Sequence, residues 1–262
     1  MTKTNFIVLS LIVSIFTLST KLANADTVTL DALPGIYPGL GGGEFTAFTD
    51  PSTFNQYYAS QALYNNGTPI NGTSVGFETF CIETGVDFTP GNWGGPTYSY
   101  TLGQVAQPIP AAGAGSAIAL TKGAAWLYFE FAKGILSGFD YTYGAGRMTD
   151  DNLLQSALWT FQGNQTYGSY VPATALNNTF YADALNAFGN SSAAADAGYT
   201  GSSVQILSLW DNSDNAAQNQ LVLTGDTNPT PTPSVPDGGS TAALLGGALL
   251  GLKLILGKKQ AS

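Results

Sequence analysis

The sequence predicts an α+β fold, a β-sheet or sandwich with a helical insertion, preceded by a signal peptide and followed by a transmembrane helix. Three observations carry this prediction. Alternating apolar residues and glycine-rich turns fill the first hundred positions, and a helical period replaces them from residue 118 to residue 188. Alternation then returns from residue 204 to residue 224. The folded domain is expected to span residues 26–226.

The first 25 residues are typical of a secretory signal peptide. Lys3 supplies the positive start, an apolar run extends from Phe6 to Leu18, and Ala23-Asn24-Ala25 fits the small-x-small cleavage rule. The mature chain is therefore expected to begin at Asp26. A retained membrane anchor is the alternative.

Five segments have the alternation of half-buried strands. They are 44–49, 74–82, 98–102 and a closing hairpin formed by 204–210 and 220–224. In the second of these, one face carries Val75, Phe77, Thr79 and Cys81, and the other carries Phe80 and Ile82. The hairpin turn Asp211–Asn215 is either a solvated turn or a weak calcium loop.

Three helices are expected between the strands. The first runs from Ile118 to Lys133 and ends at Gly134. The second begins at the N-cap cluster Thr149-Asp150-Asp151 and carries Gln155 and Trp159 on one stripe, four positions apart. The third runs from about residue 172 to residue 188.

The composition excludes several classes of function. Residues 26–235 hold three basic side chains against 16 acidic ones, and such a body would repel a phosphate backbone, so no nucleic acid is expected to bind. The chain has no histidine, which removes Ser-His-Asp and Cys-His catalysis, and a single cysteine cannot build a zinc site. We expect no metal, no cofactor and no enzymatic activity.

Cys81 is the only cysteine of an exported chain, so it has no sulfur partner within the chain. The element Phe80-Cys81-Ile82-Glu83 and the later element Gln155-Ser156-Ala157-Leu158-Trp159 resemble the two motifs of bacterial thioester domains in surface adhesins. The resemblance implies an internal thioester between Cys81 and Gln155, with Phe80 and Trp159 as pocket walls and an orienting role for Glu83. The alternative is an inert, buried Cys81.

The C-terminal tail resembles a VPDSG-type sorting signal, a relative of the PEP-CTERM signals that exosortases process. Val235-Pro236-Asp237-Gly238-Gly239 follows a Pro/Thr linker at 227–234, and Gly238 stands where the motif has serine. The signal spans 235–262 and includes an apolar run at 241–257 that is marginal for crossing a bilayer. The resemblance implies a Gram-negative-type bacterium, an exosortase-type partner, transient anchoring in the inner membrane through 241–257, and release to the surface or matrix. A simple membrane anchor is the alternative.

Together these patterns predict an exported, adhesin-like protein of the cell surface or extracellular matrix. Its partners would be surface amines or glycans of the matrix or of another cell, and coupling through Cys81 and Gln155 would be covalent. The alternative function is a noncovalent structural protein of an exopolysaccharide or biofilm matrix, in which Cys81 is inert.

Overall fold

A computed structural model describes residues 26–32, 37–39, 42–49, 76–84, 95–109, 117–163 and 177–230. The predicted signal peptide, the sorting signal at 235–262 and Val75 lie outside these residues. No helix in these described ranges is long and apolar enough to cross a membrane, and the segment 241–257 is not among them.

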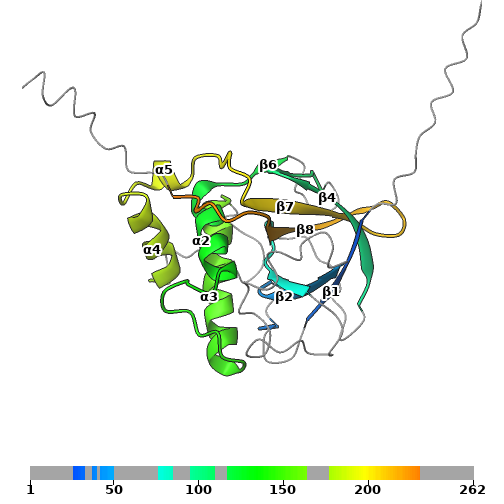
Figure 1. The fold of residues 1–262 in the computed structure, drawn as a ribbon, viewed down its shortest axis with the longest axis horizontal. Coiled ribbons are helices and arrows are strands. Elements are labelled where there is room, and N and C mark those ends of the chain that lie inside the picture. Colours follow the sequence, from blue (N-terminus) through cyan, green and yellow to red (C-terminus); the bar gives the residue numbers. More distant parts are fainter. Residues whose placement is uncertain are drawn as a thin grey trace, which may run out of the picture.

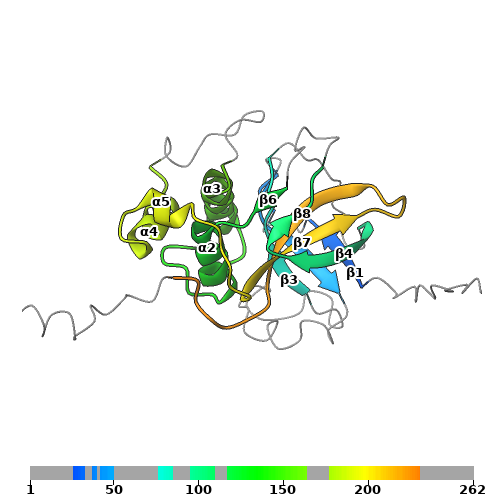
Figure 2. The same cartoon turned by 90° about the horizontal axis from the view of Figure 1, so that it is seen from above.

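Two layers make up the fold, with a sheet on one side and helices on the other (Figures 1 and 2). The six-stranded antiparallel sheet has the order β3-β2-β1-β4-β7-β8. Its strands are β1 (Thr27–Asp31), β2 (Phe45–Thr49), β3 (Gly76–Thr79), β4 (Thr97–Gly103), β7 (Val204–Trp210) and β8 (Ala216–Leu223). A two-stranded ribbon pairs β5 (Val105–Ala106) with β6 (Ile118–Ala119). The predicted strands and the closing hairpin are therefore confirmed.

The large sheet closes on itself just beyond β3. Cys81 forms an isolated antiparallel bridge with Gln220 of β8. On either side of this bridge, Leu221 donates its N–H to the Phe80 carbonyl at 3.1 Å, and Ile82 donates to the Asn219 carbonyl at 3.1 Å. Cys81 thus lies on the seam where the chain beyond β3 meets β8, so that the two ends of the strand order are joined.

Because side chains alternate along the strands, the two faces of the sheet belong to two separate hydrophobic cores. One face of the sheet packs on itself, and its buried side chains include Leu30, Phe77 and Leu207. The opposite face packs against the helices, and Phe80, Ile206 and Leu221 belong to this second cluster. The two faces follow from the period of two in an extended chain, as predicted for Phe77 and Phe80.

The helical layer is an insertion between β6 and β7. It contains α2 (Lys122–Ala132), α3 (Ala145–Phe161), α4 (Thr179–Ala187) and the short α5 (Ser192–Ala195). Its centre is an aromatic cluster around Phe131, whose ring lies edge-on to Phe80 and to Phe139, each at 5.0 Å between centroids.

The predicted starts of the first and third helices are wrong for identifiable reasons. The first helix begins at Lys122, because residues 118–119 pair as β6 and Thr121 caps the helix by accepting from the Ala124 N–H. Its predicted end at Gly134 is confirmed by a φ of 72°. The third helix begins at Thr179, where Asn178 caps it.

The N-cap predicted at Thr149-Asp150-Asp151 is also wrong. The second helix, α3, begins one turn earlier at Ala145, and Gly144 precedes it without a side-chain cap. Thr149 donates its hydroxyl to the Ala145 carbonyl within the helix, and Asp151 is fully buried. This earlier start lengthens the buried stripe of α3 by one turn.

Truncation of Phe131 to alanine should destabilise the fold strongly. The side chain is fully buried between β3 and the helices, so Phe131→Ala removes its contacts and leaves a cavity. We expect the free energy of unfolding in urea to fall by about 3–5 kcal/mol. Ile135→Ala, at a side chain that is 59% exposed, should change it by less than about 0.5 kcal/mol. Equal losses in the two variants would contradict this assignment of the core.

Candidate functional site

One face of α3 carries four buried side chains at intervals of four residues. They are Arg147, Asp151, Gln155 and Trp159. Residues four apart on a helix lie above one another on the same face. This stripe contacts the residues that lead into β2, and it reaches the seam of the sheet at Cys81.

The carboxamide of Gln155 is held against the backbone of Cys81 on both of its polar atoms. Its Oε1 accepts the Cys81 N–H at 3.1 Å, and its Nε2 donates to the Cys81 carbonyl at 2.9 Å. Oε1 also accepts the Gly43 N–H at 3.0 Å. Three backbone hydrogen bonds therefore fix the plane of a buried amide that comes from a residue 74 positions away in the sequence.

The thiol of Cys81 lies in an apolar environment. The side chain is free and fully buried, and it packs with Phe45 and Trp159 in a small hydrophobic cluster. Gln220 directs its Nε2 to the sulfur at 3.5 Å. Burial raises the pKa of the thiol above its ordinary value, so the sulfur is protonated at neutral pH.

Two glycines allow the chain before β2 to approach this cluster. A Cβ at Gly42 would lie 2.4 Å from Cη2 of Trp159 and 3.2 Å from Cγ of Gln155, so no larger residue fits without displacement. Gly43 has a φ of 122°, and a Cβ there would meet the Pro38 ring. The glycines thereby bring the Gly43 N–H within reach of the Gln155 carbonyl.

A buried ionic cluster lies one and two turns before Gln155 on the same helix face. Arg147 donates Nε to Glu44 Oε2 at 2.8 Å and Nη2 to Glu44 Oε1, and both side chains have no exposed area. Nη1 donates to the Tyr141 carbonyl at 3.1 Å. Burial opposes the charge on Arg147, but Glu44 outweighs burial and raises the pKa of the guanidinium.

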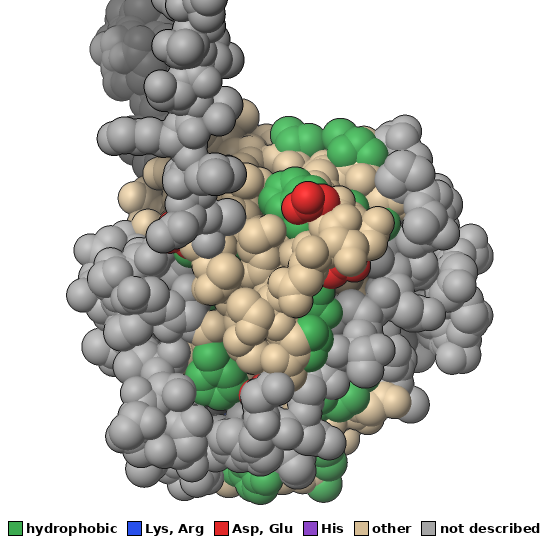
Figure 3. Space-filling model, turned by 90° about the vertical axis from the view of Figure 1, so that its right-hand side faces the viewer, with side chains coloured by type: hydrophobic (Ala, Val, Ile, Leu, Met, Phe, Trp, Pro, Cys, Tyr) green, Lys and Arg blue, Asp and Glu red, His purple; other side chains and the backbone are tan. Residues whose placement is uncertain are grey.

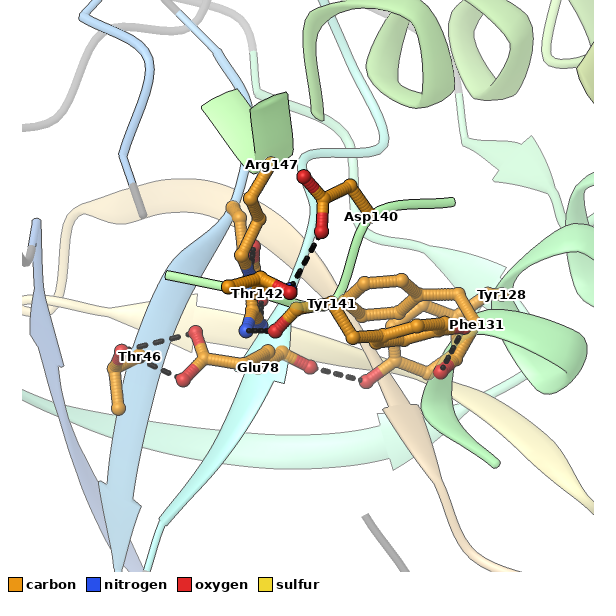
Figure 4. Close-up of polar contacts among 9 residues, drawn as sticks. Thr46, Glu78, Tyr128, Phe131, Asp140, Tyr141, Thr142 and Arg147 are labelled. Atoms are coloured by element: carbon orange, nitrogen blue, oxygen red, sulfur yellow. Dashed lines mark hydrogen bonds and ion pairs between the residues drawn. The ribbon is translucent and has the colours of Figure 1, made fainter. Parts of the chain in front are cut away.

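Two further acids of this cluster favour their neutral forms. Burial raises the pKa of Asp151 to about 12, and the charge of Glu44 adds to the effect, while both carboxyl oxygens of Asp151 lack a hydrogen-bond partner among the described residues. Burial, followed by the charge of Glu44, also raises the pKa of Glu78. Thr46 donates its hydroxyl to both Glu78 carboxyl oxygens at 2.9 Å, and Tyr128 donates to the Glu78 backbone carbonyl (Figure 4).

Glu83 is a buried acid two residues after Cys81 and is not part of the ionic cluster. Asn219 donates Nδ2 to its Oε1, while Oε2 has no hydrogen-bond partner among the described residues. Burial raises the pKa of Glu83 to about 7. Its charge acts on the Cys81 thiol and raises the pKa of that group further. Glu83 can therefore change protonation near neutral pH two residues after Cys81.

The structure brings together three of the five residues that the sequence analysis singled out. Cys81, Gln155 and Trp159 meet, whereas the Glu83 side chain, two residues after Cys81, is buried against Asn219. Phe80 does not line this site, because the alternation of the strand turns it to the opposite face, against Phe131. Phe45 occupies the place next to the thiol that was assigned to Phe80.

Sequence reasoning missed Glu44, Arg147 and Asp151. The sequence did contain a signal for two of these residues, because Arg147 and Asp151 continue the spacing of four that links Gln155 to Trp159. The false N-cap at residues 149–151 hid it by placing Arg147 outside the helix and Asp151 at its start. The adjacent glycines at 42 and 43 marked a close backbone approach.

The turn proposed as an alternative calcium loop satisfies its own polar groups. Asp211 Oδ1 accepts the N–H groups of Ser213 and Asn215 at 2.8 and 2.9 Å. Within the described ranges, no group of three or more acids or cysteines is arranged to hold a metal ion.

The VPDSG-CTERM motif matches residues 234–255 of the chain. Comparisons with curated proteins and with solved structures gave no match. A VPDSG-CTERM motif is the C-terminal sorting signal of exported, surface-directed proteins and is processed by exosortase-like enzymes. The chain accordingly carries a signal for export to the cell surface.

Replacement of Asp151 by asparagine should stabilise the protein increasingly as the pH rises. The folded state holds the Asp151 proton to about pH 12, whereas the unfolded chain releases it near 3.8. This raised pKa contributes stability that is fully present below pH 3.8 and declines as the pH rises. Asparagine cannot ionise, so Asp151→Asn should gain about 2 kcal/mol or more over the wild type between pH 4 and pH 8 in urea unfolding.

The matched control is Asp183→Asn, which removes a half-buried carboxylate from α4, outside the cluster. The gain in stability over the wild type should rise with pH more steeply for Asp151→Asn than for this control. Equal slopes in the two variants would show that Asp151 is ionised in the folded protein.

Proposed function

We propose that this exported protein couples covalently to amine-bearing targets at the cell surface through an internal thioester between Cys81 and Gln155. The observation that supports the proposal most is the seating of the Gln155 carboxamide, whose oxygen and nitrogen both bond to the Cys81 backbone in a buried site. A thiol and a carboxamide confined in this way react as if within one small molecule.

Bond formation requires the sulfur to attack Cδ of Gln155. The S–C bond forms, the C–N bond breaks, and the thiol proton passes to the nitrogen, which leaves as ammonia. During the attack, negative charge develops on Oε1. The N–H groups of Gly43 and Cys81 point at this atom at 3.0 and 3.1 Å, so they form a two-donor oxyanion hole that needs no rearrangement.

Coupling reverses the roles of sulfur and nitrogen. An incoming amine attacks the same carbon, the new C–N bond forms, the S–C bond breaks, and a proton from the amine returns to the sulfur. The product is an amide between Gln155 and the target together with a free Cys81. Each molecule reacts once, so the protein is a single-use binder and does not turn over as an enzyme does.

The apolar walls protect the thioester from water before a target arrives. Phe45 and Trp159 cover the thiol, and the Gly42 backbone lies against the indole ring. Hydrolysis would consume the acyl group without coupling. The exclusion of water therefore preserves the thioester, as it preserves other reactive covalent intermediates.

The charge of the molecule favours cationic amines as targets. The face in Figure 3 shows Asp and Glu side chains but no Lys or Arg among the described residues. Among the described cations, Arg147 is buried against Glu44 and Lys133 pairs with Asp226 at 2.9 Å. An acidic surface attracts protonated amines such as lysine side chains and polyamines and raises their local concentration.

The sorting signal provides delivery. The VPDSG-CTERM motif directs the chain outward, and the predicted linker at 227–234 leads to it from the domain, where Thr227 and Asn228 bond to Ser203 and Glu130. We propose that 241–257 anchors the chain transiently in the inner membrane and that an adhesin-like role at the surface or in a biofilm matrix follows. An inert Cys81 would instead leave a noncovalent matrix protein that binds glycans.

Intact mass spectrometry of the purified mature protein tests the thioester. The wild type should be lighter than its sequence mass by about 17 Da, the mass of the ammonia that leaves. Cys81→Ala and Gln155→Ala should each abolish the deficit, because each removes one partner of the bond. Addition of methylamine should replace the deficit by a gain of about 14 Da and release one titratable thiol.

Gln205→Ala serves as the matched control, since Gln205 is a half-buried glutamine on β7. Its deficit should persist. A wild-type protein of full mass with a free thiol would refute covalent coupling and favour the noncovalent matrix role.

We also propose that Glu83 accepts the proton of the attacking amine. Its Oε2 has no hydrogen-bond partner among the described residues, burial raises the pKa of the group to about 7, and its charge acts on the Cys81 thiol. The methylamine coupling rate should therefore rise as the pH passes through about 7, where Glu83 becomes a carboxylate.

Glu83→Gln should slow coupling by about 10²-fold and remove the inflection near pH 7. Glu130→Gln, at a half-buried acid on α2, should keep both the rate and the inflection. An inflection that survives in Glu83→Gln would assign the titration to another group.

A further inference from the structure

We infer that the buried ion pair of Glu44 and Arg147 is a positioning device that holds the Gly43 N–H on the Gln155 carbonyl. The inference rests on the proposed thioester function and assigns residues that neither adhesin-type motif contains. Its basis is the stripe of α3, where the ionic cluster and the Gln155 amide contact neighbouring residues of one short segment.

The segment before β2 needs an external support. Gly42 and Gly43 restrict their own backbone little, and Gly43 has a φ of 122° that other residues rarely adopt. Glu44 follows Gly43 directly and lies before β2, which begins at Phe45. Phe45 then enters β2 opposite Thr79. The Gly43 N–H thus lies between Gly42, whose backbone is little restricted, and Glu44, whose carboxylate is held by Arg147 of α3.

The pairing of Glu44 with Arg147 sets position and angle together. A guanidinium binds a carboxylate through two parallel N–H groups, so the pair fixes the plane of Glu44 as well as its distance from α3. The carbonyl of Tyr141 fixes the remaining guanidinium nitrogen at 3.1 Å. The same rigid helix carries Gln155 two turns further on. Helix α3 therefore positions both the segment that carries the Gly43 donor and the Gln155 acceptor.

Stability alone does not account for such a pair. Removal of two charges from water costs several kcal/mol per ion in proteins, and apolar residues of similar size are often as stable. Four titratable side chains with no exposed area lie here, Glu44, Glu78, Arg147 and Asp151. What the ion pair provides and an apolar contact lacks is a defined direction for the backbone at Gly43.

Asp151 lies one turn before Gln155, between the amide and Arg147 on the same helix face, and both of its buried carboxyl oxygens lack a hydrogen-bond partner among the described residues. A second carboxylate at this position would oppose the negative charge that develops on Oε1 during attack on the amide carbon. A neutral Asp151 does not add that charge, and the positioning contact itself is the pair of Glu44 and Arg147.

The experiment compares Arg147→Lys with Asp151→Asn in the full mature chain. Lysine keeps the charge but loses the two-pronged geometry, whereas asparagine keeps the shape and the hydrogen-bonding capacity of a neutral Asp151. We expect Arg147→Lys to slow thioester formation and methylamine coupling by at least about tenfold, toward the effect of losing one oxyanion donor. Asp151→Asn should keep rates close to those of the wild type.

Amide hydrogen exchange of Gly43 reads the positioning without reference to the thioester. In Arg147→Lys, the Gly43 N–H should exchange at least about tenfold faster, while the Cys81 N–H, which lies on the seam of the sheet, stays protected. The double variant Glu44→Gln, Arg147→Met removes both charges, so its fold does not depend on an unpaired buried ion. It should show the same loss of Gly43 protection.

Phe180→Leu controls for a general loss of stability, because Phe180 is buried in the helical layer on α4, away from Glu44. It should lower the melting temperature yet leave coupling and Gly43 exchange unchanged. Unchanged Gly43 exchange in both cluster variants would overturn the inference. A wild type of full mass would refute the thioester, and the exchange data would still decide the positioning role.

Discussion

The hydrogen bonds between the Gln155 carboxamide and the Cys81 backbone join the two layers of this protein at its seam. Cys81 lies where β3 runs on to meet β8, and Gln155 projects from the helix that packs over the sheet. A buried amide costs free energy unless each polar atom has a partner. Helix α3 can therefore dock in only one register, the register that satisfies Oε1 and Nε2. The remainder of the stripe, Arg147, Asp151 and Trp159, follows from that register.

The site combines features that general stability does not require. The fold buries a thiol in an apolar cluster, directs two N–H groups at one carbonyl oxygen, and places an acid with a pKa of about 7 nearby. Proteins tend to collect perturbed acids and oriented backbone donors where bonds are made or broken. The absence of histidine from the sequence leaves Glu83 as the group in this site that changes its charge near neutral pH.

Helix α3 contacts both the ionic cluster and Cys81, through Arg147 and Gln155. Glu44 is adjacent to Gly43, and Arg147 lies two turns from Gln155, so any shift of α3 along the sheet would alter both contacts together. This arrangement couples the geometry of the N–H donors on Gln155 Oε1 to a bidentate ion pair, whose distance and direction vary less than those of an apolar contact. Delivery remains a separate function of the chain, because the VPDSG-CTERM motif at 234–255 follows the folded domain.

Local patterns in the sequence were sufficient for β2, β3, β4, the closing hairpin, the helical insertion and the choice of Cys81 and Gln155 as candidates, whereas β1 and the ribbon of β5 and β6 were not predicted. Alternation and helical spacing are local properties, and two short motifs marked the candidates. Tertiary structure decided the rest. Strand alternation alone could not show that Phe45, and not Phe80, would lie beside the thiol, since that depends on which face meets Trp159. The partnership of Glu44 with Arg147 joins residues 103 positions apart, and only the docking of α3 on the entrance to β2 brings them together.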